Sequence, residues 1–386
     1  MSSIKATIRA GVSQHNSSLF HAMRFEVGDP AAFLDIVSED GQRKTILLIR
    51  DVELDRARKE VRADEISCPA DYTPEGGLSA DREVATAQGT AECLKQHGVT
   101  SVTGDRSLPL SFVQVLGEAG LVVECDLQLG VHGRRQKSEE EIAMIRHSQG
   151  ITEGAIQMAC ELIARAEAGS SGVLLWEGME LTSERIRAAV NHYLVDQGFN
   201  GPQFIIAGGA HGAIGHHIGH GPLHTAQPVI VDIYPTDRST HYCGDCTRTV
   251  VHGELSDEIA QMHQTVVVAK AAAIAAIRAG TTGKAVHAET ARVITEAGYA
   301  VVIPGQERSH DLAILDHGTG HGIGLEVHEP PLLDAKGIEL IAGDAVTVEP
   351  GLYKTGLGGV RVEDIVIVTD EGCDNLNNLP EGLDWS

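Results

Sequence analysis

The sequence predicts an α/β domain followed by a larger α+β domain. With 386 residues, the chain exceeds what one typical hydrophobic core supports. Up to about residue 130, strand-like apolar runs alternate with helix-like segments, whereas the remainder combines long helices with hairpin-like segments that carry acids. The stretch GVHGRRQKSEEE, first glycine-bearing and then strongly charged, separates the two patterns. We therefore expect domains at 1–133 and 134–386.

The first domain shows the pattern of a small mixed sheet with helices. Strands are predicted at 43–51, 99–105 and 121–127, and helices at 81–97 and 108–120. Alternating elements of this kind imply a mainly parallel or mixed sheet. The domain has no glycine-rich phosphate loop and no spaced set of metal ligands. We expect it to cover the mouth of a site or to form a subunit interface.

The second domain is expected to place pairs of helices on one face of a curved antiparallel sheet. Ser138 and Glu141 have the spacing of a capping box and open a long helix with an apolar stripe. Further helices are predicted at 183–197, 256–279 and 284–297, each ending at a glycine. Each pair of helices adjoins one acidic hairpin, which hints at an internal duplication.

Charge and hydropathy exclude several classes of partner. Lys and Arg number 30 against 54 Asp and Glu, a net charge of −24, so nucleic acid and anionic membranes would repel the protein at long range. No apolar run reaches the roughly 18 residues of a membrane span, and MSSIKATIRAGVSQHNSS lacks the apolar core of a signal peptide. We expect a cytoplasmic protein.

The seven cysteines fit reduced thiols better than a disulfide framework. Cys243 and Cys246 form a CxxC, which could be a redox pair or half of a zinc site that recruits His252. No second CxxC follows at zinc-ribbon spacing, so we favour the interpretation that both cysteines pack around Asp245.

Five residues of the second domain could ligate two metal ions. They lie in two acidic hairpins and in a glycine-rich segment between them, HGTGHGIGLEVHE, whose glycines allow close approach of backbone and ligand. The five candidates are Asp232, Asp245, His321, Glu349 and Glu363.

Four carboxylates that converge would disfavour one another's ionisation unless cations lay between them. Two divalent cations would resolve that repulsion. A set of carboxylates with one imidazole suits Mn, Co, Zn or Fe, and the oxygen-rich ligation leans towards the harder ions. Manganese is expected first, with cobalt or zinc as alternatives.

Five motifs in a fixed order resemble the metal-dependent pita-bread peptidases, the superfamily of methionine aminopeptidase, aminopeptidase P and prolidase. The motifs are HHIGHGPL, GDCTRT, HGTGHGIGLEVHE, VEPGLY and GVRVED. The resemblance covers residues 134–386, and the preceding α/β domain is similar in size and placement to the creatinase-type amino-terminal domain. It implies a pita-bread catalytic domain in an exopeptidase.

The resemblance also implies roles for the site residues. Asp232 would bind one metal ion, His321 and Glu349 the other, and Asp245 and Glu363 would bridge both. A hydroxide between the ions would be the nucleophile, and Glu349 would take and return its proton.

Histidines and one arginine would complete the implied site. His216 and His328 would donate to the scissile carbonyl and its oxyanion, and His317 would line the substrate pocket. Arg361 could orient Asp232, with a plain strand salt bridge as the alternative. The resemblance favours His216 over its neighbour His217, because the spacing from His216 to the following glycines, proline and leucine matches the family's HxxGxGPL.

Most of the 19 histidines are expected to be incidental polar groups of loops or surface. This expectation covers His211, His217, His220, His224 and His241. The spacing of thirteen residues from Asp232 to Asp245 predicts a lengthened turn within PTDRST, as in one branch of the proline-directed peptidases. The short segment from Glu349 to Glu363 lacks the insert that supplies a carboxylate-binding arginine in some prolidases, which weakens a strict dipeptidase assignment.

The leading hypothesis is an Xaa-Pro aminopeptidase or Xaa-Pro dipeptidase that acts on short peptides with proline in second position. One alternative is a related two-domain hydrolase for a small non-peptide amide or amidine, as creatinase is, although creatinase works without metal. Another is a non-catalytic binding protein, which retention of all five ligands disfavours. A homodimer is expected, because two-domain relatives commonly pair.

Overall fold

The structure is a computed structural model that describes residues 4–302 and 311–386. The chain divides into two compact units, Met1–Arg134 and Arg135–Ser386. This division lies one residue beyond the boundary that the charged stretch predicts.

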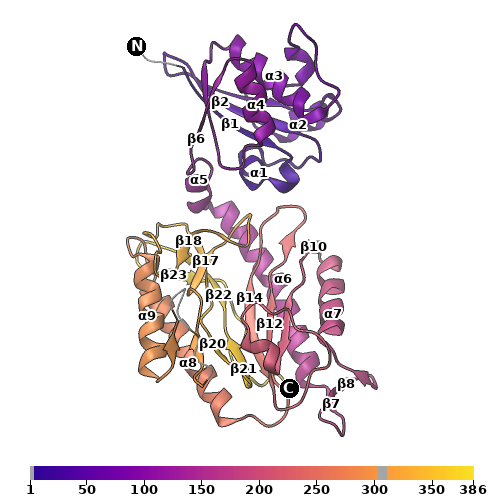
Figure 1. Cartoon of the computed structure of the whole chain (residues 1–386), viewed down its shortest axis with the longest axis vertical. Helices are drawn as coiled ribbons and strands as arrows, with labels where there is room; N and C mark the ends of the chain where they lie inside the picture. Colours follow the sequence, from indigo (N-terminus) through magenta and orange to yellow (C-terminus); the bar gives the residue numbers. More distant parts are fainter. Residues whose placement is uncertain (1–3, 303–310) are drawn as a thin grey trace. The chain divides into compact units, whose positions relative to one another are not determined.

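The first unit is built on a six-stranded mixed sheet in the order β4-β3-β2-β1-β5-β6 (Figure 1). Strands β1, β2 and β3 are antiparallel neighbours, whereas β4, β5 and β6 run parallel to the strand beside them. The strands are β1 (Lys5–Gly11), β2 (Ala31–Val37), β3 (Arg43–Leu48), β4 (Glu65–Ser67), β5 (Ser101–Gly104) and β6 (Val122–Cys125). The helices are α1 (Ser17–Met23), α2 (Leu54–Glu60), α3 (Arg82–Gln96), α4 (Leu110–Glu118) and α5 (Val131–Arg135), the last ending across the division.

Alternation along the strands gives this sheet a core on each face. In β2, Leu34 packs with the apolar residues of α3 and α4, whereas its neighbour Phe33 packs with those of α1 and α2. Successive side chains of a strand point to opposite faces, so one apolar run supplies both cores. The mixed sheet and five elements of this unit are as predicted, but β1, β2, β4, α1, α2 and α5 were not foreseen.

Four long helices frame the second unit where the sequence predicts them, although α8 ends at Ala276, before the predicted stop at Gly280. They are α6 (Glu139–Ala164), α7 (Ser183–Asp196), α8 (Asp257–Ala276) and α9 (Gly283–Glu296). The Ser138 side chain accepts from the Glu141 amide at 3.3 Å, and the Glu141 carboxylate accepts from the Ser138 amide at 2.9 Å, which confirms the capping box of α6. Ser256 caps α8 in a similar way, through the Ile259 amide.

The strands of the second unit are short and, with one exception, antiparallel. The three-stranded sheet contains β11 (Ile205–Gly208), β12 (Pro228–Ile233) and β14 (Cys246–Val251). The five-stranded sheet contains β18 (Glu329–Leu333), β17 (Gly320–Gly322), β19 (Ala345–Val348), β22 (Asp364–Val368) and β23 (Cys373–Asn375). The four-stranded sheet contains β15 (Ala300–Val301), β16 (Ile314–Leu315), β20 (Gly351–Lys354) and β21 (Gly358–Arg361), of which β15 and β16 are parallel. Two small sheets contain β7 (Glu167–Ala168), β8 (Leu174–Trp176) and β9 (Met179–Glu180), and β10 (Phe199–Asn200) and β13 (Thr236–Asp237).

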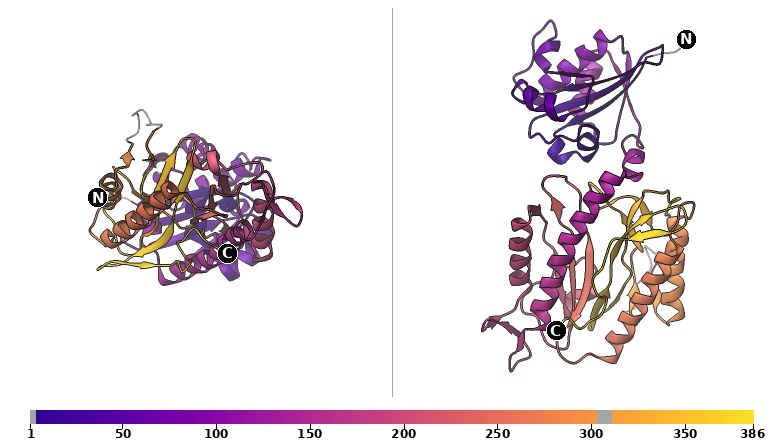
Figure 2. Two further views of the ribbon diagram at one scale, coloured as in Figure 1. Left: turned by 90° about the horizontal axis from the view of Figure 1, so that it is seen from below. Right: turned by 180° about the vertical axis from the view of Figure 1, so that it is seen from behind.

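Helices α6 and α8 lie across the back of these sheets (Figure 2). One core joins α6 and α7 to β12 and β14, and two others join α8 and α9 to the strands of the second half. The helices therefore cover one face of the sheets, as predicted, and leave the other face free for a site.

Two further observations concern membranes and thiols. Among residues 4–302 and 311–386, none of the helices has both the length and the apolar character that crossing a bilayer requires. All seven cysteines carry free thiols, and Cys243 and Cys246 are buried, in agreement with the packing interpretation of the CxxC.

Candidate metal centre

Two acids come from the strand pair β12 and β14. Asp232 lies on β12 opposite Thr247 of β14, and Asp245 directly precedes β14. The backbone of Asp245 is held by Gln149 of α6, whose side-chain amide accepts from the Asp245 N–H at 2.9 Å and donates to its carbonyl at 2.7 Å. The long α6 thus fixes where this carboxylate sits.

The other two acids come from β19 and β22. Glu349 directly follows β19 and Glu363 directly precedes β22, and these strands pair so that Val348 lies opposite Asp364. The glycine-rich segment between the two acids was expected to be a turn. It instead forms a separate hairpin, β20 and β21, whose last residue is Arg361.

His321 enters from β17, which pairs with β19, the strand that leads to Glu349. A side chain at Gly320 would lie 2.0 Å from the Thr347 carbonyl oxygen of β19, and one at Gly322 would lie 2.5 Å from the Glu329 carbonyl oxygen. Only glycine permits such approach, as the sequence predicts. The backbone can therefore bring His321 against the acids.

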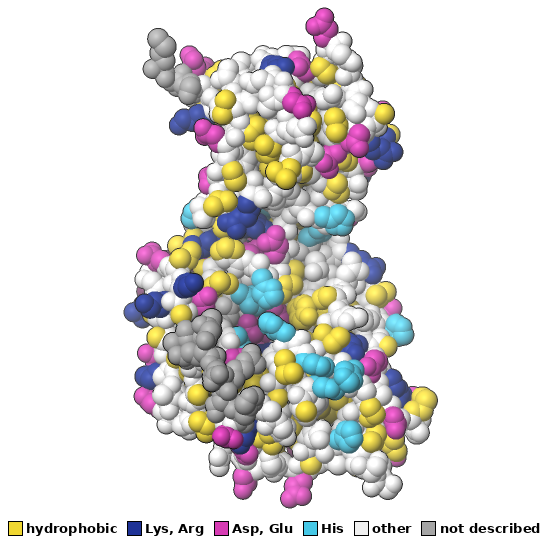
Figure 3. All heavy atoms as spheres, viewed as in Figure 1, with side chains coloured by type: hydrophobic (Ala, Val, Ile, Leu, Met, Phe, Trp, Pro, Cys, Tyr) yellow, Lys and Arg dark blue, Asp and Glu magenta, His cyan; other side chains and the backbone are white. Residues whose placement is uncertain are grey.

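All five predicted ligands line one cavity of about 430 Å³. Ligand atoms of Asp245, His321 and Glu363 lie within 4.8 Å of one another. His321 Nε2 is 3.7 Å from Asp245 Oδ2 and 3.5 Å from Glu349 Oε1. On this face of the second unit, acidic and histidine side chains meet in a hollow (Figure 3).

His321 presents the ring nitrogen that a metal ion needs. Its Nδ1 lies 3.1 Å from the Gly322 carbonyl oxygen, an acceptor, so Nδ1 carries the proton and Nε2 faces the acids with a free lone pair. Burial, assisted by the neighbouring His328, lowers the pKa of His321 to about 4. The ring is therefore neutral at pH 7.

The acids repel one another strongly without a cation. Burial and the charges of Glu363 and Asp232 hold the pKa of Asp245 well above its usual range. Burial and the charge of Glu363 do the same to the pKa of Glu349, while burial and Asp232 raise the pKa of Glu363 to about 7. Neighbouring carboxylates with raised pKa values fit a cation site.

Arg361 lies at the centre of a buried network beside the acids. Its Nη2 donates to Asp232 Oδ2 at 2.5 Å, and its Nη1 donates to the Tyr353 hydroxyl at 2.8 Å. The sequence left open whether Arg361 orients Asp232 or forms a plain salt bridge, and the structure pairs it with Asp232 itself. The other carboxylate oxygen, Asp232 Oδ1, is buried without a hydrogen-bond partner. That buried oxygen fits a metal ligand.

The predicted substrate histidines also line the cavity, namely His216, His317 and His328. His317 Nδ1 lies 2.7 Å from the Gly318 carbonyl oxygen, and His317 Nε2 lies 2.8 Å from the Tyr353 hydroxyl. Burial, with a smaller effect of Arg361, lowers the pKa of His317 to about 3, so the neutral ring donates through Nδ1 and accepts at Nε2. Both nitrogens of His317 are thus engaged.

The structure distinguishes His216 from His217. His216 lines the cavity and lies close enough to His328 to assist burial in lowering the pKa of His328. His217 instead stacks on His211, with ring centroids 4.3 Å apart. This arrangement agrees with the preference for His216.

Three supporting residues were not found from the sequence. Tyr353 joins Arg361 to His317, Thr247 donates from its hydroxyl to Glu363 Oε2 at 2.7 Å, and Gln149 holds Asp245. Tyr353 lies inside the motif VEPGLY and Thr247 inside GDCTRT, so their place in these motifs could have identified them from the sequence. Gln149 lies on a helix and carries no comparable signal.

The donor set fits divalent cations. It offers carboxylate oxygens, one neutral imidazole and an unsatisfied buried oxygen, which suits Mn, Co or Zn. The ligands would be Asp232, Asp245, His321, Glu349 and Glu363.

The model of the metallopeptidase family M24 matches residues 143–370 of this chain. The probable dipeptidase PepE of Mycobacterium tuberculosis is 38% identical over 205 residues, 52% of this chain and 51% of that protein. The chain thus matches about half the length of this curated relative.

Solved structures resemble the whole chain. The Xaa-Pro dipeptidase from Bacillus anthracis has a TM-score of 0.79 at 25% identity, over 98% of this chain and 94% of that one. The X-Pro aminopeptidase from Thermotoga maritima has a TM-score of 0.77 at 24% identity, over 98% and 97%. The fold is therefore that of the two-domain pita-bread proteins.

Proposed function

The chain belongs to metallopeptidase family M24, and we propose that it is a two-metal exopeptidase that hydrolyses the peptide bond before proline. The observation that carries the proposal is the convergence of four acids and one neutral histidine in one cavity. Dipeptidase and Xaa-Pro peptidase relatives support the substrate class.

The five ligands would hold two divalent cations, which lower the pKa of a water molecule so that it can attack a carbonyl at neutral pH. Glu349 remains about one-fifth exposed at its side chain and borders the cavity. It is therefore the acid that can take a proton from the attacking water and return it to the leaving nitrogen. Asp245 and Glu363 are more fully buried, so they would serve only as negatively charged ligands of the cations.

Two histidines would act on the scissile carbonyl. His216 and His328 are exposed to solvent and line the cavity, so their N–H groups can reach a bound peptide. His317 has both nitrogens occupied and would shape the pocket. Arg361 would keep Asp232 oriented towards the cations.

The proline preference has a physical basis. The imide nitrogen of proline has no N–H and fixes φ, so a protease that binds its substrate as a strand handles it poorly. Attack by an activated water with histidine donors needs no such pairing. A cavity of about 430 Å³ lies in the range of small-molecule sites and suits a short peptide.

The test is hydrolysis by protein freed of metal and reconstituted with Mn, Co or Zn. Ala-Pro and Ala-Pro-Ala are offered beside Met-Ala, with Glu349→Gln as the inactive control and His192→Ala, an exposed histidine of α7, as the matched control. Cleavage of Ala-Pro alone identifies a dipeptidase, and cleavage of Ala-Pro-Ala identifies an aminopeptidase.

Hydrolysis of Met-Ala with both proline peptides intact would overturn the substrate class. Two bound ions with no peptide cleaved would instead favour the non-peptide or binding alternatives. The homodimer, the cytoplasmic location and the preference for manganese remain predictions, and a monomer in sedimentation at micromolar concentration would refute the first.

A further inference from the structure

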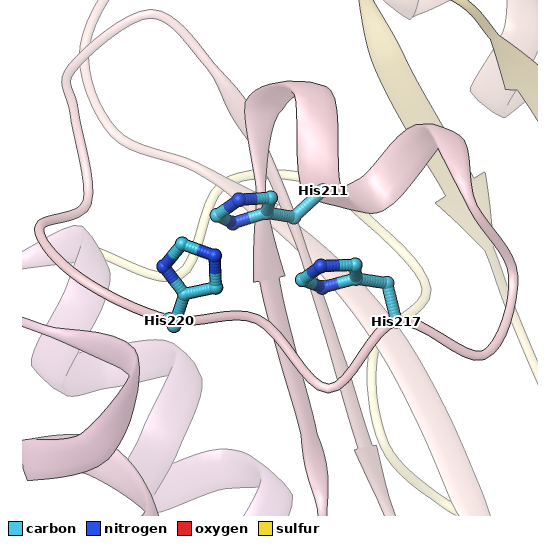
Figure 4. Close-up of side chains that lie close together, drawn as sticks. All are labelled: His211, His217 and His220. Atoms are coloured by element: carbon cyan, nitrogen blue, oxygen red, sulfur yellow. The ribbon is translucent and has the colours of Figure 1, made fainter.

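Three histidines gather outside the carboxylate centre. His211 belongs to a short 3-10 helix at Gly209–Ala213, and His217 and His220 lie on the chain that returns from it towards β12. Their rings converge on one point of the loop (Figure 4). One ring nitrogen from each histidine lies within 4.8 Å of the others. From their pattern in the sequence, these residues were expected to be incidental polar groups.

The rings need only a small contraction to share an ion. His211 and His217 are parallel, with 6° between their planes, and the centroid of His220 is 4.1 Å from that of His211. A tetrahedral site with metal–nitrogen bonds of about 2.0–2.1 Å needs nitrogens roughly 3.3 Å apart. His220 is exposed and the other two are half-buried, so rotation of the rings can close this difference.

The loop that carries two of the histidines is held in place from both sides. The Ile218 carbonyl accepts from the Ile206 N–H of β11 at 3.0 Å and from Arg187 Nη1 of α7 at 2.6 Å. The Gly221 N–H donates to the Glu184 carboxylate at 3.2 Å. At Gly219, which has φ +75°, a side chain would lie 1.8 Å from the Ile206 carbonyl oxygen. These contacts hold the backbone that carries His217 and His220 in one conformation.

The surroundings of His211 favour its neutral imidazole. Burial and the neighbouring His217 and His220 lower the pKa of His211, and Glu184 is close enough to oppose that shift. The Gly219 N–H donates to His217 Nδ1 at 2.9 Å. Binding of a metal ion to His217 places a proton or the ion on Nδ1, so this hydrogen bond is lost on binding.

We propose that His211, His217 and His220 bind one transition-metal ion of the class that prefers imidazole nitrogen, with Zn²⁺ as the first choice. Imidazole donors suit Zn, Cu and Ni, whereas the oxygen-rich centre suits Mn. The two sites thus differ in donor chemistry. Because His216 lies between His211 and His217 in the sequence, the ion braces the loop that carries it. The site itself does not depend on the proposed peptidase activity.

The test uses the whole chain with the carboxylate centre filled by Mn²⁺. The protein is dialysed against Zn²⁺, and both metals are counted per chain by mass spectrometry. One Zn²⁺ with Mn²⁺ retained is expected. His220→Ala should weaken Zn²⁺ binding by more than about tenfold, the smallest loss seen even for groups that only orient a ligand. His192→Ala is the matched control and should bind as the unchanged protein does.

Zn²⁺ that enters only as Mn²⁺ leaves, or that binds equally to His220→Ala, would overturn the proposal. Asp245→Asn distinguishes the two centres, because it damages the carboxylate centre and should leave this Zn²⁺ site intact. Since His220 is exposed, its replacement should not unfold the chain, which circular dichroism checks. Amide exchange gives a second readout: Zn²⁺ should slow exchange in residues 211–221 and change the signal of the Gly219 amide.

Discussion

At the scale of single residues, the centre depends on groups that fix the ligands as much as on the ligands. A buried line of hydrogen bonds runs from Asp232 through Arg361 and Tyr353 to His317. It links the Asp232 carboxylate to His317, and both residues line the cavity. Partners of this kind set the orientation and basicity of ligands.

Arg361→Lys should impair the centre although it keeps the charge. A lysine has no planar fork and cannot serve both Asp232 and Tyr353 in one geometry. We expect kcat/KM to fall about 10- to 100-fold, with weaker metal binding. Arg146→Lys, at an exposed pair with Asp374, is the control and should change neither. Unaltered kinetics of Arg361→Lys would show that the network is only structural.

Tyr353→Phe tests the same network without a change of charge. It removes the hydroxyl that accepts from Arg361 and meets His317 Nε2, so two buried groups lose a partner. We expect a loss of stability of about 1–3 kcal/mol in urea unfolding and a lower kcat. Tyr299→Phe, at a half-buried tyrosine that does not line the cavity, should cost little. A variant as stable and active as the parent would contradict the role assigned to Tyr353.

At the scale of elements, local patterns predicted the helices well because capping residues and glycine stops act over a few residues, and the acids at strand ends proved to line one cavity. Ser138 with Glu141 and Ser256 are examples of such capping residues. Strand pairing was harder. The pairing of β19 with β22 around an inserted hairpin depends on partners far apart in sequence, and the segment 351–359 was therefore expected to be a single turn.

Gly320→Ala should displace β17. The added methyl group would lie 2.0 Å from the Thr347 carbonyl oxygen, so β17 must move from β19 and carry His321 with it. We expect a lower Tm and weaker metal binding. Gly117→Ala on α4 is the matched control, because open space surrounds it and alanine favours a helix by about 0.5–1 kcal/mol. Full metal occupancy in Gly320→Ala would contradict this account of the strand.

At the scale of the whole molecule, the sequence predicted both units and the cavity residues but not how the first sheet begins. The segments that form β1 and β2 are apolar without a distinctive local pattern. Their antiparallel pairing is apparent only in the folded sheet. The three-histidine cluster was likewise set aside, because its members come together only through the fold of one loop.

Removal of metal should make stability depend on pH. In the metal-free protein the folded pKa of Glu363 is about 7 against a usual 4.5, so the folded state binds more protons than the unfolded chain between these values. The stabilisation is full below about pH 4.5 and is lost as the pH rises through 7. Tm of the metal-free protein should therefore fall between pH 5.5 and pH 8, and metal should restore it most at pH 8.

Glu363→Gln should flatten this dependence in the metal-free protein, whereas Glu254→Gln at an exposed position should leave it unchanged. A metal-free protein that gains stability as the pH rises from 5.5 to 8 would contradict the burial of like charges at the centre.

The central claim is that five residues hold two catalytic cations, and the most direct measurement counts them. Mn²⁺ per chain is measured in the His211→Ala, His220→Ala background, which removes the second candidate site, together with cleavage of Ala-Pro-Ala and Ala-Pro. Two ions per chain are expected in this background and fewer after Asp245→Asn, and the rate of hydrolysis should follow the number of ions bound. Two ions retained in Asp245→Asn, or hydrolysis that persists after their removal, would contradict the central claim.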